Sequence, residues 1–152
     1  MSLYISLRFK GIVKEKLREK FQSIALYGNW KTSDDKILST FGKNRYASFI
    51  PCAKSIMVDK WMENPLQTKY NKNTGEWEFQ VDLNINTFPW IEWLEEIIPY
   101  CMESVSHFET CYEAWGNNYK TTCLEEFING KFNLIGWIDE NNELLPKDFF
   151  IN

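Results

Sequence analysis

The chain has few of the residues from which metal and phosphate sites are built. It contains a single His, and its four Cys are too far apart in sequence for a CxxC pair, so no zinc-binding set of familiar spacing can be written. Its seven Gly stand singly, which excludes a Gly-rich phosphate-binding loop. GxSxG and HExxH motifs are missing too. We therefore expect no metal and no cofactor.

Long apolar runs are also missing. No stretch approaches the roughly 20 apolar residues of a membrane-spanning helix, and residues 1–10 have the pattern of a strand carrying Arg8 rather than that of a signal peptide. We expect a cytoplasmic protein without membrane contact. In that compartment the four Cys are expected to be reduced, mostly buried thiols. They are Cys52, Cys101, Cys111 and Cys123.

Aromatic side chains and segregated charge are abundant. Aromatic residues make up 16% of the chain, more than a small core needs, so some are expected at an interface. Residues 1–60 carry twelve Lys or Arg against five Asp or Glu, a net +7, whereas residues 61–152 carry five against sixteen, a net −11. Either basic and acidic elements neutralise each other within the fold, which we favour, or one face binds an oppositely charged partner.

Alternation of apolar and polar residues predicts the first strands. The period of two holds without error over residues 77–86, which only a one-faced β-strand produces. We expect this strand to be central in the sheet. Residues 3–9 alternate in the same way, and residues 66–70 lead through a Gly-containing turn into the 77–86 strand, which predicts a hairpin.

Helical spacing follows these strands. Residues 13–28 predict a first helix, residues 29–64 an insertion with two short helices, and residues 87–101 a second helix that Pro99 should kink. The basic first helix should lie beside the acidic second one. The expected partners are Lys14, Lys16, Arg18 and Lys20 on one side and Glu92, Glu95, Glu96 and Glu103 on the other.

The C-terminal third completes the predicted sheet. Residues 107–115 alternate as a strand, and residues 121–128 and 131–137 flank Asn129-Gly130, a strong hairpin signal. The element order through residue 115 resembles the ferredoxin-like superfold, an antiparallel sheet with two helices on one face. We predict one α+β domain, residues 1–152, with a β-α-β-β-α-β ferredoxin-like sheet, a helical insertion after the first helix and an added C-terminal β-hairpin. A superfold implies no function.

The residues best placed for chemistry lie on the 107–115 strand. His107, Glu109 and Cys111 share one face of it, because alternate residues of a strand do. A thiolate activated by His and oriented by a carboxylate is the arrangement of nucleophilic catalysis. Such neighbours lie about 6.5 to 7 Å apart at Cα, and the alternative, which we favour, is a polar sheet face on which the His has no catalytic role.

One short stretch has a recognisable pattern, Trp115-Gly116-Asn117-Asn118-Tyr119. It resembles the Trp-Gly-x-x-Trp stretch of plasmid- and phage-borne ferredoxin-like proteins of the YubB type, with Tyr in place of the second Trp. Five residues of 152 assign no family.

We therefore predict a non-catalytic protein-interaction module of the immunity, inhibitor or accessory type, from a bacterium or mobile element. The alternative is a small enzyme that uses the Cys/His/Glu face. The expected partner is another protein or a second copy of the chain. Nucleic acid is not expected, because the sequence pI is about 5.1 and the polar face lacks stacking aromatics. The predicted contact residues are Tyr4, Arg8, Glu78, Asp82, Glu109, Glu113 and Trp115.

Overall fold

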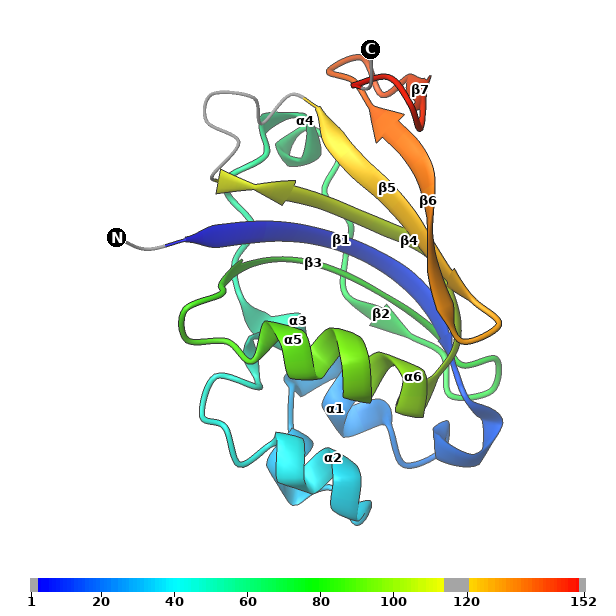
Figure 1. The fold of residues 1–152 in the computed structure, drawn as a ribbon. Helices are drawn as coiled ribbons and strands as arrows, with labels where there is room; N and C mark the ends of the chain where they lie inside the picture. Colours follow the sequence, from blue (N-terminus) through cyan, green and yellow to red (C-terminus); the bar gives the residue numbers. More distant parts are fainter. Residues whose placement is uncertain (1–2, 114–120, 151–152) are drawn as a thin grey trace.

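One curved antiparallel sheet organises the fold (Figure 1). The computed structural model describes residues 3–113 and 121–150, and within them the sheet has seven strands in the order β2-β3-β1-β4-β5-β6-β7. The strands are β1 (Tyr4–Val13), β2 (Lys69–Tyr70), β3 (Glu76–Asn84), β4 (Met102–Tyr112), β5 (Thr122–Ile128), β6 (Lys131–Ile138) and β7 (Leu144–Pro146).

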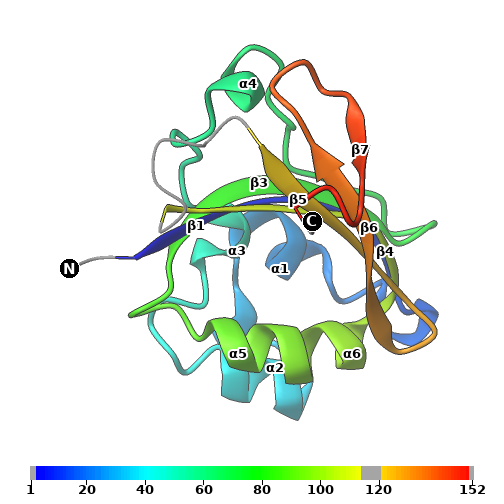
Figure 2. The ribbon, with the colours of Figure 1, turned by 45° about the horizontal axis from the view of Figure 1, so that its top comes forward.

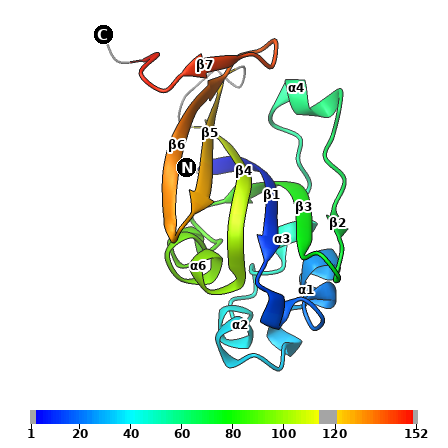
Figure 3. The same ribbon diagram turned by 90° about the vertical axis from the view of Figure 1, so that its right-hand side faces the viewer.

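Short helices cover one face of the sheet, and α4 lies over the other (Figures 2 and 3). The covering helices are α1 (Gln22–Tyr27), α2 (Lys36–Phe41), α3 (Phe49–Cys52), α5 (Trp90–Glu92) and α6 (Ile98–Cys101), with the π segment η3 (Trp93–Ile97) between the last two. The 3-10 turns are η1 (Glu15–Leu17) and η2 (Trp30–Thr32), and α4 is Asp59–Met62. None of the helices in the described part of the chain has the length and apolar character that crossing a membrane requires.

An aromatic cluster fills the core between the sheet and the helices. Trp77 lies 5.4 Å from Phe9, centroid to centroid, and Trp93 lies edge-on to Trp30 at 5.9 Å. The indole of Trp77 also donates to the Ala25 carbonyl at 3.0 Å. Much of the aromatic content therefore lies in the core, where rings of the strands pack against rings of the helices.

Several predicted strands and both predicted hairpins are confirmed. The 77–86 pattern is β3, and β2 pairs with its first residues. The turn between β5 and β6 places Asn129 and Gly130 at φ 53° and 78°, the positive values that a two-residue hairpin turn requires. The expected central position of β3 is wrong: it lies second from the edge of the sheet, because only β2 flanks its outer side.

The ferredoxin-like prediction is wrong. The structure is mostly one seven-stranded antiparallel sheet with few short helices, and only 28% of it is helical. Residues 13–28 do not form one helix, because β1 continues to Val13, whose N–H donates to the Gly75 carbonyl at 2.8 Å. The 3-10 turn η1 and the short helix α1 take its place. The C-terminal hairpin is not an appendage either, since β5 pairs directly with β4 and extends the same sheet.

The second predicted helix survives as a continuous helical path over residues 90–101. As predicted, the helical path does not end at Pro99. It departs from α-helical geometry just before that residue, where the Ile98 N–H donates to the Trp93 carbonyl, five residues back. Pro99 has no N–H to donate, which weakens the α-helical ladder at this point.

The basic residues of the 13–28 segment meet the C-terminal end of this helical path. Lys14 Nζ donates to the Pro99 carbonyl at 2.8 Å, Lys16 lies over the Tyr100 ring, and Arg18 Nη2 lies 3.6 Å from Glu103 Oε2. Cations at a helix C-terminus are stabilising. The segregated charges are thus partly neutralised inside the fold, although only the Arg18 to Glu103 contact is one of the predicted ion pairs.

The insertion predicted for residues 29–64 supplies α2, α3 and α4. Asp35 caps α2: its Oδ1 accepts the N–H groups of Ile37 and Leu38 at 2.9 and 3.1 Å. After α3 the chain crosses to the opposite face of the sheet. We call residues 53–66, which include α4, the cover segment.

Candidate functional site

Polar side chains of β1 and β3 hold the cover segment on the sheet. Asp82 Oδ2 accepts the N–H groups of Ile56 and Met57 at 2.7 and 3.0 Å, and its Oδ1 accepts the Ser6 hydroxyl at 2.6 Å. Gln80 Oε1 accepts the Leu66 N–H at 3.0 Å. Each contact pairs a polar group that burial would otherwise leave unsatisfied. The polar residues of β3 therefore bind the chain itself.

A buried network centred on Glu109 joins α4 to the strands. Glu109 Oε1 lies 2.8 Å from His107 Nε2, whereas its Oε2 accepts the Trp61 indole N–H at 3.2 Å and the Thr122 hydroxyl. Lys60 Nζ lies 3.6 Å from the same Oε2. Only 7% of the Lys60 side chain and 4% of the Glu109 side chain are exposed, so this is an ion pair inside the protein.

The rest of the Lys60 ammonium is hydrogen-bonded as well. It donates to Thr122 Oγ1 at 2.9 Å and to the carbonyls of Ile138 and Asp139 at 3.0 and 3.1 Å. Lys60 thereby ties α4 to the start of β5 and to the end of β6. A buried ammonium needs such a set of acceptors, because an unpaired charge costs several kcal/mol, on the order of the effective desolvation penalty of an ion.

The pKa values of this network follow from burial and from its internal contacts. Burial alone raises the pKa of Glu109, but hydrogen bonds from His107 and Thr122 and the charges of His107 and Lys60 outweigh it and hold that pKa below 4.5. Burial lowers the pKa of Lys60, and the Glu109 carboxylate opposes that shift. Glu109 is thus a carboxylate at neutral pH, satisfied by groups of the same chain.

The structure brings together two of the three predicted catalytic residues. His107 and Glu109 are in contact, but Cys111 is fully buried in a small cluster with Val58 and Trp61 beneath α4. Burial raises the pKa of the Cys111 thiol to about 11. The thiol is therefore protonated near neutral pH, and it lacks the thiolate character that a nucleophile requires.

The predicted contact residues differ in their exposure and in their partners within the chain. Tyr4 is 36% exposed and its N–H donates to Glu113 at 2.9 Å. Arg8 donates to the Asn64 carbonyl and lies over the Trp61 ring, so it holds the cover segment, as Asp82 and Glu109 do. Trp115 lies outside the described residues.

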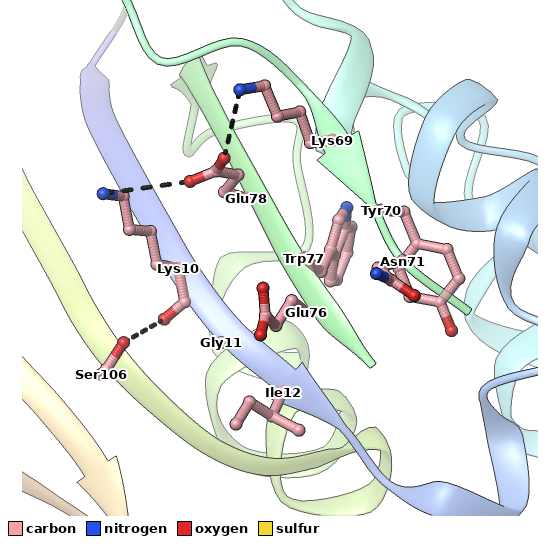
Figure 4. Close-up of a pocket in the computed structure, with 10 residues that line it drawn as sticks. All are labelled: Lys10, Gly11, Ile12, Lys69, Tyr70, Asn71, Glu76, Trp77, Glu78 and Ser106. Atoms are coloured by element: carbon pink, nitrogen blue, oxygen red, sulfur yellow. Dashed lines mark hydrogen bonds and ion pairs between the residues drawn. The ribbon is translucent and has the colours of Figure 1, made fainter. Parts of the chain in front are cut away.

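A hollow of about 710 Å³ opens on the uncovered part of the polar face (Figure 4). Lys10 and Lys69 lie on either side of Glu78, each with its Nζ 3.9 Å from a different carboxylate oxygen. The two Lys charges are matched in number by Glu78 and Glu76, which line the same hollow. His107, Glu109 and Cys111 do not line the hollow, so it gives no access to the predicted catalytic set.

Sequence reasoning missed an exposed apolar cluster at the end of the sheet. The ring of Phe150 lies 4.7 Å from Trp137 and 5.0 Å from Phe149, centroid to centroid. Phe149 and Phe150 are 49% and 58% exposed. We call Trp137, Phe149 and Phe150 the aromatic end. The adjacent Phe149 and Phe150 in a polar tail were the available signal.

Comparison of the chain with family models, with curated proteins and with solved structures found no match. Within residues 3–113 and 121–150, no group of three or more His, Cys, Asp or Glu is arranged to hold a metal ion. The function is therefore inferred from the geometry of the chain itself.

Proposed function

We propose that this chain is a non-catalytic protein-interaction module and that the aromatic end is its contact surface. The observation that carries the proposal is the clustering of exposed large apolar side chains there. Single exposed apolar residues are ordinary, whereas contiguous ones mark interaction sites. Burying a Phe side chain contributes about 1.5 to 3 kcal/mol, so Phe149 and Phe150 together can anchor a partner.

The part of the polar face that the cover segment closes supports the same proposal. A catalytic His, Glu and Cys need a cleft in which substrate meets them. Here Glu109 is saturated by His107, Trp61, Thr122 and Lys60, and the cover segment lies above Cys111. We propose a cytoplasmic module of the immunity, inhibitor or accessory type, and Cys101 and Cys111, buried as reduced thiols, are compatible with that compartment.

A paired capture experiment tests the proposal. The chain and the double variant F149S/F150S are immobilised and exposed to the same lysate, with Y27S/I91S as the matched control, because Tyr27 and Ile91 are 67% and 62% exposed outside the aromatic end. We expect F149S/F150S to lose a protein that the parent and the control both retain, with an unchanged melting temperature. Equal capture by all three would contradict the proposal.

A second candidate function is a small enzyme, and the contact of His107 with Glu109 favours it. A buried carboxylate 2.8 Å from His107 Nε2 orients the imidazole, as general bases require. This candidate predicts turnover in a panel of ester, phosphate and glycoside substrates that His107→Gln removes. Activity that is absent, or unchanged in His107→Gln, leaves the interaction module as the better account.

A further inference from the structure

The outer edge of β6 is only half occupied. β7 pairs with Gly136, Trp137 and Ile138 of β6. Among the described residues no strand pairs with the outer side of residues 131–134, and a register shift between Leu134 and Gly136 separates the two halves. On their outer side, these four residues have no neighbouring strand in the described part of the chain.

The main-chain groups of Phe132 and Leu134 face this open edge. Ile128 and Lys131 flank the two-residue turn and pair with each other, so in an antiparallel ladder the next residue, Phe132, directs its N–H and C=O outward, Asn133 inward and Leu134 outward again. Outward N–H and C=O groups at a regular spacing of two residues are a template for another strand.

An apolar shelf accompanies these groups on the helix-covered face. The Phe132 ring lies 5.1 Å from both Phe108 and Phe127, and Leu134, on the same face of β6, is 40% exposed. A strand added beside β6 could cover Leu134 with an apolar residue of its own, because cross-strand neighbours on one face pack together.

The fold and its charge specify the occupant. β7 already adds to the same edge in antiparallel fashion, so the edge accepts an extended segment. In the β5–β6 hairpin, residues 122–138, two Glu (Glu125 and Glu126) stand against one Lys (Lys131), a net −1. The same region of a second copy would bring like charge, whereas a basic segment would be attracted.

We infer that residues 131–134 of β6 form a strand-addition site for an extended segment of a partner protein in which Lys or Arg alternates with apolar residues. The inference rests on the proposed function and names the chemistry of its partner. The main chain supplies affinity through hydrogen bonds at Phe132 and Leu134, and the alternating side chains supply specificity.

Amide hydrogen exchange with defined peptides tests this site. The probes are a capped peptide that alternates Lys and Val and a matched one that alternates Glu and Val. We expect the Lys-Val peptide to slow exchange at Phe132 and Leu134 several-fold, while Asn133, already paired with Glu126, changes little. Equal slowing by both peptides, or by neither, overturns the inference. Slowing with protein concentration alone, together with a dimer in sedimentation, identifies a second copy as the occupant and also overturns it.

Two variants connect the site to the captured protein. Leu134→Pro removes an outward N–H, which an edge strand tolerates, and should abolish peptide protection at Phe132. If this variant melts early, Leu134→Lys replaces it, since an edge Lys opposes strand pairing. A captured protein that F149S/F150S loses but both Leu134 variants retain refutes the strand-addition site and leaves the proposed function standing. Retention by all these variants refutes both.

Discussion

Lys60 and Glu109 form an ion pair inside the protein, with Nζ 3.6 Å from Oε2 and more than nine-tenths of each side chain buried. The pair joins α4 of the cover segment to β4. Since the remaining protons of Lys60 and the other Glu109 oxygen also have partners, either charge left alone would be buried without its counterpart.

Removing both partners of this pair should therefore cost less than the sum of the two single removals. Lys60→Met or Glu109→Gln alone should lower the free energy of unfolding by about 3 to 5 kcal/mol, and the double variant by less than the sum. Urea unfolding measures all three. Lys69→Met is the control, because Lys69 is 69% exposed at 3.9 Å from Glu78, and it should cost about 1 kcal/mol or less. Additive losses would contradict the coupling.

Glu109 should also make stability depend on pH. Its pKa in the folded protein lies below the ordinary value of 4.5, so the unfolded chain takes up the proton first. The stabilisation is present above pH 4.5 and is lost as the pH falls through the folded pKa. Urea midpoints between pH 7 and pH 3 should fall more steeply for the parent than for Glu109→Gln. Parallel curves would show that another carboxylate controls acid unfolding.

The sequence reveals the strands better than it reveals what covers them. Alternation over residues 77–86 located β3, and Asn129-Gly130 located a hairpin, because both signals are local. The same alternation suggested that Asp82 and Glu109 face a partner, yet both are buried by the cover segment. No local pattern in residues 53–66 predicts that they pack on the sheet, because their contacts are with residues far away in the sequence.

The candidate site was predicted only in part for the same reason. His107 and Glu109 were correctly placed on one face of a strand, a consequence of the strand period. The burial of Cys111 depends on Trp61 and Val58, which are about fifty residues away in sequence. No sequence motif identifies Lys60 and Thr122 as members of the Glu109 network.

Trp93 and Trp77 differ in one hydrogen bond, and their Phe variants should differ accordingly. Both rings are buried in the aromatic core, but Trp93 Nε1 has no hydrogen-bond partner, whereas Trp77 Nε1 donates to the Ala25 carbonyl. Trp77→Phe leaves that carbonyl unpaired and should be more destabilising than Trp93→Phe by about 1 to 3 kcal/mol. Denaturant melts compare the two directly. An equal cost, or a larger cost for Trp93→Phe, would rule out this account.

Cys111 should be the slow thiol and Cys52 a faster one. Burial raises the pKa of Cys111 to about 11, and the side chain lies under Trp61, whereas Cys52 is exposed. Because the thiolate is the reactive form, iodoacetamide near neutral pH should label Cys52 first in the folded chain, as mass spectrometry of the digest would show. Trp61→Ala should speed labelling of Cys111 by uncovering it, and Ile91→Ala, at an exposed position of α5, is the control. Rapid labelling of Cys111 in the parent chain would mean that the cover segment opens readily, and it would favour the enzyme over the interaction module.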